Sequence, residues 1–129
     1  MEIFRVLYVD DDADIREIAA MSLALDPAIE VHTCASGQEA LATAAAWQPQ
    51  LVLLDVMMPG MDGPETLAKL KAEPQTAAIP IVFITARTQA YEVERFLSLG
   101  AIGVIAKPFD PIELAAQARR YLDGDRVEG

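Results

Sequence analysis

The feature of the sequence that most constrains the fold is a short apolar run that ends on an acid. Leu51–Asp55 reads LVLLD, and the turn formers Pro59 and Gly60 follow closely. Four consecutive apolar residues are too few for a helix, but they suit a strand buried on both faces, as in a parallel sheet. Open α/β sheets bind their ligands at the carboxyl ends of such strands. We therefore predict that Asp55 lies at a functional site.

Length and composition favour one domain with a packed core. The chain has 129 residues, of which 53% are hydrophobic, so a single core is expected and disorder is not. No apolar run approaches the roughly 20 residues of a membrane span, and the first residues lack the layout of a signal peptide. With one cysteine, Cys34, these features predict a cytoplasmic protein. The net charge of −10 argues against direct binding of nucleic acid. We expect a domain over residues 1–124 and a polar tail over 125–129.

Five β-rich segments alternate along the chain with five helical patterns. Strands are expected over 4–9, 30–34, 51–55, 79–85 and within 101–106, and helices over about 12–25, 36–47, 64–72, 89–99 and 110–122. This alternation implies right-handed crossovers. It therefore predicts an α/β fold, a doubly wound parallel sheet with helices on both faces.

Helix ends carry recognisable signals. Asp12 is a candidate N-cap for the first helix, and Ser36 with Glu39 has the form of a capping box. Gly100 is expected to be the C-cap of the fourth helix. Asp110, with a proline directly after it, is expected to open the last helix.

Polar residues stand at the carboxyl ends of four of the expected strands. They are Asp10 and Asp11, Asp55, Thr85, and Lys107. In a doubly wound sheet these ends converge on one rim, where three neighbouring carboxylates would need a cation. A site with oxygen ligands and no histidine or cysteine suits Mg²⁺ or Mn²⁺. Together with a hydroxyl and an ammonium group, it predicts phosphoryl transfer, with the carboxylate as a possible nucleophile.

These residues and their flanking motifs resemble the receiver domain of two-component response regulators. The resemblance covers about residues 4–122 and rests on four motifs in order: Val9-Asp10-Asp11, Asp55 with Met58–Gly63, Thr85-Ala86, and Lys107-Pro108-Phe109. It implies a flavodoxin-like (βα)5 fold with strand order 2-1-3-4-5. It also implies a phosphorylation-dependent switch in a phosphorelay, which catalyses its own phosphorylation and dephosphorylation but turns over no external substrate.

The same resemblance assigns roles at the strand ends. Asp55 would accept a phosphoryl group from a phosphohistidine on a histidine kinase or a histidine phosphotransfer protein. Asp10, Asp11 and Asp55 would hold Mg²⁺, with the backbone carbonyl of Met57 as a further ligand.

Two further residues would act on the phosphoryl group itself. Thr85 would hydrogen-bond its oxygens, and Lys107 would neutralise them. We also expect a cis peptide bond between Lys107 and Pro108, which would aim the ammonium group back over the strand ends.

One position departs from the family pattern. Many receivers have an aromatic residue three positions before the lysine, where this chain has Val104. A valine is stiff at χ1 and offers no large swing. We therefore expect the signal to pass through residues 86–89 to the face made by the fourth helix, the fifth strand and the fifth helix. That face would bind a downstream protein or a second copy through Tyr91, Arg95, Arg119 and Arg120, since interfaces favour Tyr and Arg.

Two other functions compete with the switch. An Mg²⁺-dependent phosphatase could also use Asp55 as its nucleophile, but phosphatases that resemble haloacid dehalogenases usually have a second acid two residues later. Met57 stands there instead. A binding module that is never phosphorylated would have no need of the acids, Thr85 and Lys107 together.

Overall fold

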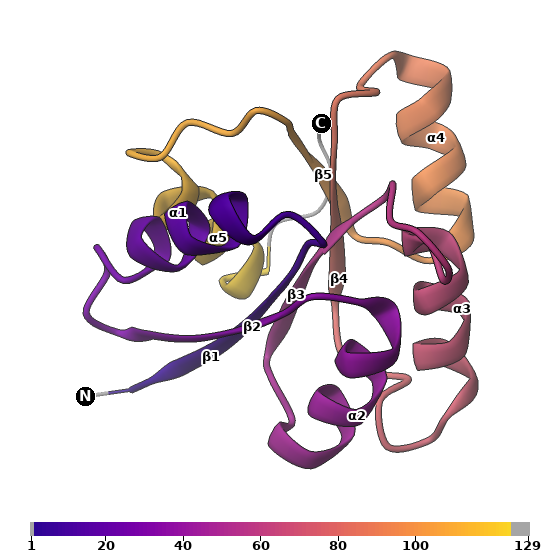
Figure 1. Ribbon diagram of the computed structural model, residues 1–129, viewed down its shortest axis with the longest axis horizontal. Coiled ribbons are helices and arrows are strands. Elements are labelled where there is room, and N and C mark those ends of the chain that lie inside the picture. The colour runs from indigo at the N-terminus through magenta and orange to yellow at the C-terminus, as the bar shows by residue number, and fades with distance from the viewer. Residues whose placement is uncertain (1, 125–129) are drawn as a thin grey trace.

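The computed structural model describes residues 2–124, which form five strands and five helices in strict alternation (Figure 1). The strands are β1 (Phe4–Val9), β2 (Ile29–Cys34), β3 (Leu51–Asp55), β4 (Ile81–Thr85) and β5 (Gly103–Ala106). The helices are α1 (Ala13–Leu23), α2 (Gly37–Trp47), α3 (Gly63–Ala72), α4 (Ala90–Leu99) and α5 (Leu114–Leu122). The predicted polar tail, 125–129, lies outside the described residues.

The five strands form one parallel sheet in the order β2-β1-β3-β4-β5. Helices α1 and α5 cover one face of the sheet, and α2, α3 and α4 cover the other (Figure 1). This arrangement confirms the predicted flavodoxin-like fold and strand order. Within the described residues, no helix is long and apolar enough to cross a membrane.

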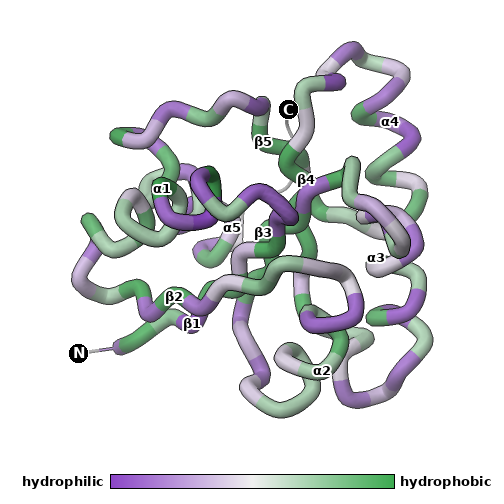
Figure 2. The backbone as a smooth tube through the Cα atoms, in the orientation of Figure 1, coloured by the Kyte–Doolittle hydropathy of each residue, from purple (hydrophilic) through white to green (hydrophobic). Residues whose placement is uncertain are grey.

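The central strand β3 is buried along its whole length, as its apolar run predicts. Val52 and Leu54 pack into the core on the side of α2, α3 and α4, whereas Leu51 and Leu53 pack into the core on the side of α1 and α5. Successive side chains of a strand point to opposite faces. The apolar colour of the tube is accordingly concentrated in the sheet (Figure 2). A strand between two cores needs apolar residues at consecutive positions, and β3 has them.

Most helix ends follow the predicted signals. The Asp12 side chain accepts hydrogen bonds from the backbone N–H groups of Asp14 and Ile15 and so caps α1. Ser36 caps α2 by accepting from the N–H of Glu39. Gly100 ends α4 with φ of 117°, the left-handed conformation that a glycine adopts readily.

Some element boundaries differ from the predicted ones, by one residue at the start of β2 and by two at the end of α1. β4 begins at Ile81 rather than at residue 79, since Pro80 has no N–H to donate to a sheet ladder. α5 begins at Leu114 rather than near Asp110. Asp110 does cap the chain there, because its side chain accepts from the N–H of Ile112, but residues 111–113 form a turn before the helix.

Candidate functional site

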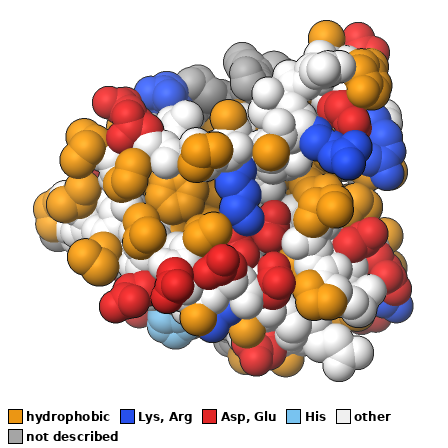
Figure 3. Space-filling model, turned by 45° about the horizontal axis from the view of Figure 1, so that its top comes forward, with side chains coloured by type: hydrophobic (Ala, Val, Ile, Leu, Met, Phe, Trp, Pro, Cys, Tyr) orange, Lys and Arg blue, Asp and Glu red, His pale blue; other side chains and the backbone are white. Residues whose placement is uncertain are grey.

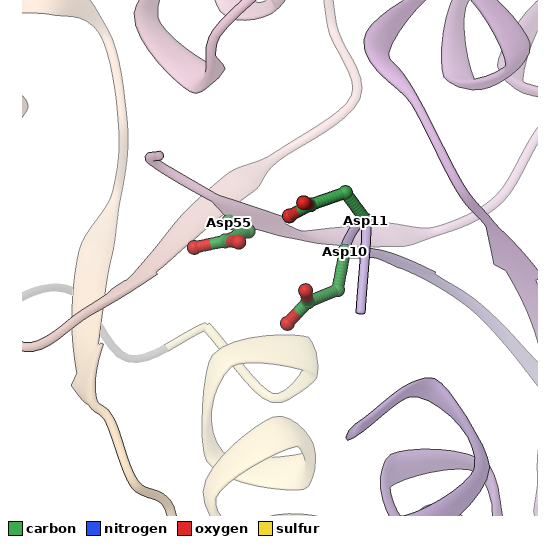
Figure 4. A group of neighbouring side chains, drawn as sticks. All are labelled: Asp10, Asp11 and Asp55. Carbon is green, nitrogen blue, oxygen red and sulfur yellow. The ribbon is translucent and has the colours of Figure 1, made fainter. Parts of the chain in front are cut away.

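The carboxyl ends of β1 and β3 bring three acidic side chains together. β1 and β3 are adjacent in the sheet, so Asp10, directly after β1, lies beside Asp55, the last residue of β3. One carboxylate oxygen from each of Asp10, Asp11 and Asp55 lies within 4.8 Å of the other two. The three side chains surround one small space at the edge of the sheet (Figure 4). Asp10 and Asp55 are buried, whereas Asp11 is exposed.

Lys107 joins this acidic cluster from the end of β5. Its Nζ lies 3.0 Å from Oδ2 of Asp10 and 3.3 Å from Oδ2 of Asp55. The peptide bond between Lys107 and Pro108 is cis, as predicted. Acidic side chains gather beside a basic one on this face of the molecule (Figure 3). The site therefore combines two buried carboxylates, one exposed carboxylate and one ammonium group.

Burial and mutual repulsion perturb the ionisation of the cluster. The pKa of Asp55 rises to about 6, first because the group is buried and then because Asp10 is close, although Lys107 opposes this rise. Burial lowers the pKa of Lys107, but hydrogen bonds and charge interactions with Asp10 and Asp55 outweigh it, so the net shift is upward. The lysine thus stays protonated, and the carboxylates remain only partly compensated.

The donor set fits a hard divalent cation. Asp10, Asp11 and Asp55 offer oxygen atoms only, and the described part of the chain places no histidine or cysteine among them. Carboxylate oxygens in a compact group are the ligands that Mg²⁺ prefers. Burial and then the charge of Asp10 raise the pKa of Asp55, and a cation there would relieve the repulsion between these two acids.

Comparison with known proteins decides the family. Residues 6–119 match the family model described as the response regulator receiver domain. The chain belongs to this family. It is a signalling domain and not a substrate-turnover enzyme, and the comparisons give the phosphatase alternative no support.

Individual relatives agree with this assignment. The chain is 38% identical over 118 residues to the DNA-binding response regulator MtrA of Mycobacterium tuberculosis (strain ATCC 25618 / H37Rv), covering 92% of this chain and 50% of MtrA. It is 43% identical over 116 residues to the response regulator PleD of Caulobacter vibrioides (strain NA1000 / CB15N), covering 89% of this chain and 25% of PleD. The chain thus spans half or less of the length of these two relatives.

A solved structure supports the same fold over nearly its full length. The chemotaxis protein CheY4 of Vibrio cholerae superposes on the receiver domain with a TM-score of 0.83 and 34% identity. The match covers 92% of this chain and 98% of that protein.

Two predicted site residues lie at the rim of the cluster without an ion pair to it. Thr85 is buried at the end of β4, and its carbonyl accepts a hydrogen bond from the N–H of Lys107. Its hydroxyl accepts from the N–H of Arg87 at 3.0 Å. The backbone of Met57 opposes the rise in the pKa of Asp55, while the Met57 side chain is exposed. The receiver domain therefore brings all the predicted positions to one edge of the sheet.

The sequence reasoning missed two contacts of the site. Tyr8 is fully buried and donates its hydroxyl to Oδ2 of Asp10 at 3.2 Å, an oxygen that Lys107 also approaches. Tyr8 and Asp10 are two residues apart along an extended chain, so they point to the same face. That spacing could have revealed the contact. The ion pair between Arg87 and Glu92 was also not predicted.

One residue of the face that was predicted to bind a partner, Arg119, makes contacts within the domain instead. Arg119 lies on α5 but pairs with Asp26, with 2.6 Å between Nη1 and Oδ2, and its guanidinium stacks over the ring of Phe4 at 4.7 Å. It therefore links α5 to the segment after α1. Tyr91, Arg95 and Arg120 are exposed, as a docking surface requires.

Proposed function

We propose that Asp55 is the phosphoryl acceptor of this receiver domain and takes its phosphoryl group from a phosphohistidine on a partner protein. The observation that carries the proposal is the position of Asp55. It is a buried carboxylate at the end of the central strand, next to two further acids and 3.3 Å from the ammonium of Lys107.

The reaction is a displacement at phosphorus. A carboxylate oxygen of Asp55 forms a new P–O bond while the P–N bond to the imidazole of the partner breaks, and the imidazole keeps the electron pair of that bond. The nucleophile must be ionised, and a pKa of about 6 leaves most of the Asp55 population ionised at neutral pH. Lys107 is close enough to stabilise the charge on the transferred oxygens, and Thr85 can donate its hydroxyl proton to one of them.

Mg²⁺, or Mn²⁺ in its place, would be held by Asp10, Asp11 and Asp55 with the backbone carbonyl of Met57. When bound, it would offset negative charge on the phosphoryl oxygens. Within the chain itself, the acidic cluster supports this assignment, because its repulsion is only partly relieved by Lys107.

The partners follow from the same chemistry. A histidine kinase or a histidine phosphotransfer protein would supply the phosphoryl group, in the cytoplasm. We propose that residues 1–124 form the receiver domain. Its output would be a downstream protein, or a second copy, that binds the face of α4, β5 and α5 through Tyr91, Arg95 and Arg120. Direct contact with nucleic acid is not part of the proposal for this acidic domain.

A phosphotransfer assay tests the proposal. A panel of histidine kinases, each labelled on histidine, is incubated with the receiver domain and Mg²⁺. We expect at least one kinase to transfer its label to the wild type and not to Asp55→Asn. Transfer that survives in Asp55→Asn would refute the assignment, as would steady turnover of a small phosphate ester by the wild type.

A further inference from the structure

An ion pair on the rim of the site connects the end of β4 to α4. Nη1 of Arg87 lies 3.5 Å from Oε2 of Glu92, and the two side chains are 64% and 12% exposed. Glu92 is one of the few buried charged residues in the described part of the chain. Within residues 2–124, Arg87 is its only ion-pair partner. A buried carboxylate is costly without a compensating charge, so Arg87 stabilises Glu92 where it lies.

The backbone of Arg87 is also hydrogen-bonded to Thr85, a residue of the proposed phosphorylation site. Its backbone N–H donates to the hydroxyl of Thr85, and the carbonyl of Thr85 accepts from the N–H of Lys107. A hydroxyl that accepts one hydrogen bond still has its own proton to donate. Thr85 can therefore donate to an oxygen near Asp55 while it still accepts from the N–H of Arg87, which keeps the backbone of Arg87 next to the site.

The first turn of α4 carries the acidic partner of this ion pair. Its N-cap residue, Gln89, makes no side-chain hydrogen bond to the helix, so no side chain at that position anchors the helix start. Glu92 is the acid of the first turn, where a negative charge is favourable. Tyr91, next to Glu92, is 66% exposed and belongs to the proposed docking face.

We propose that Glu92 is a positioning residue that holds Arg87 against α4 in the unphosphorylated domain. A phosphoryl group on Asp55 adds negative charge and acceptor oxygens at the site, and these compete with Glu92 for the guanidinium. When Arg87 turns to the phosphoryl group, Glu92 loses its counter-charge and the start of α4 rearranges beside Tyr91. The inference rests on the proposed function, since it requires a phosphoryl group at Asp55.

Thermodynamic linkage makes the proposal measurable. If the ion pair exists only in the unphosphorylated state, removing its acid favours the other state. Beryllofluoride is the probe, because with Mg²⁺ it mimics an aspartyl phosphate. In Glu92→Gln we expect beryllofluoride to bind about two- to fivefold more tightly than in the wild type, the range for an ion pair with one exposed partner. Glu94→Gln is the matched control, since Glu94 is an exposed acid on the same helix, and its affinity should equal that of the wild type.

A second variant separates positioning from helix stability. Arg87→Gln removes both the ion pair and the cation that would turn to the phosphoryl group. Its affinity for beryllofluoride should therefore not show the gain expected for Glu92→Gln. In amide NMR spectra without beryllofluoride, residues 88–93 of Glu92→Gln should shift toward their positions in the beryllofluoride-bound wild type. Equal affinities in the wild type, Glu92→Gln and Glu94→Gln would overturn the inference, and so would an equal gain in Arg87→Gln. A wild type that binds no beryllofluoride would instead overturn the proposed function.

Discussion

The carboxyl group of Asp55 illustrates how the fold sets the chemistry of a single residue. Burial at the end of β3 and the nearby charge of Asp10 raise its pKa to about 6. Its Oδ2 lies 3.3 Å from the ammonium of Lys107. Nearby cations therefore stabilise the ionised form of Asp55. Without a metal ion, the charge of Asp55 reduces the stability of the fold at neutral pH.

The first prediction concerns this pH dependence. In the unfolded chain Asp55 has an ordinary pKa near 3.8, so between about pH 4 and 6 the folded state binds more protons than the unfolded state. The contribution of Asp55 to the free energy of unfolding should therefore rise as the pH falls through this window, by up to about 3 kcal/mol. Urea unfolding of the metal-free wild type and of Asp55→Asn across pH 4–7 measures this contribution as the difference between their free energies of unfolding. A difference that does not change with pH would contradict the assigned pKa.

Most of the candidate site could be predicted from the positions of individual residues in the sequence, because the carboxyl ends of the strands in a parallel sheet lie at one edge. Asp10, Asp11, Asp55 and Lys107 each follow or end a β-rich segment, and the structure joins them within 4.8 Å or by ion pairs. The contact between Arg87 and Glu92 could not be predicted in this way. It depends on how the loop after β4 turns, and local sequence patterns do not fix that geometry.

At the scale of elements, the strands between two cores were the most predictable. The bounds of β1 and β3 agree with the predicted ranges, because every residue of β3 and most of β1 are buried. The start of α5 was predicted wrongly, because Asp110 caps a turn rather than the helix itself. A capping signal fixes a local hydrogen bond but not whether the following turn continues as a helix.

The second prediction separates the cap of α1 from the acidic cluster beside it. Asp12 accepts two backbone hydrogen bonds at the start of α1 and lies outside the cluster of three acids. Asp12→Ala should therefore lower the free energy of unfolding by about 1 kcal/mol and leave Mg²⁺ affinity unchanged. Asp12→Asn, which keeps an acceptor, should retain most of the stability. Loss of Mg²⁺ binding in Asp12→Ala would place this acid among the ligands instead.

The third prediction concerns the junction between β3 and α3. A Cβ added at Gly63 would lie 2.5 Å from the carbonyl oxygen of Asp55 and 2.8 Å from Cα of Val56. These are backbone atoms, so the chain itself must move. We expect Gly63→Ala to lower the free energy of unfolding by about 1–3 kcal/mol and to weaken Mg²⁺ binding, because Asp55 shifts.

Gly60→Ala is the control for this junction. Gly60 has φ of 74° but no atom within 4 Å of an added Cβ, so its replacement strains the loop without pushing on Asp55. It should leave Mg²⁺ affinity close to that of the wild type. Equal Mg²⁺ affinity in Gly63→Ala and the wild type would show that this close contact does not position Asp55.

At the scale of the whole molecule, the acidic site and the fold should be linked. A cation that binds only the folded state stabilises it by mass action. We therefore predict that Mg²⁺ at about 100 times its Kd raises the free energy of unfolding by roughly 2.7 kcal/mol. Asp11→Ala should remove most of this gain, and Glu94→Gln should keep it. A melting temperature that does not respond to Mg²⁺ at millimolar concentrations would count against the metal site.

The central claim is that the fold makes Asp55 the phosphoryl acceptor, and chemical trapping tests it most directly. The receiver domain is phosphorylated with acetyl phosphate and Mg²⁺, reduced with borohydride, and digested for peptide sequencing by mass spectrometry. Borohydride converts an aspartyl phosphate to homoserine, so the modified position is read from the sequence. The account predicts homoserine at position 55 and nowhere else. Homoserine at position 10 or 11, with Asp55 unchanged, would contradict it.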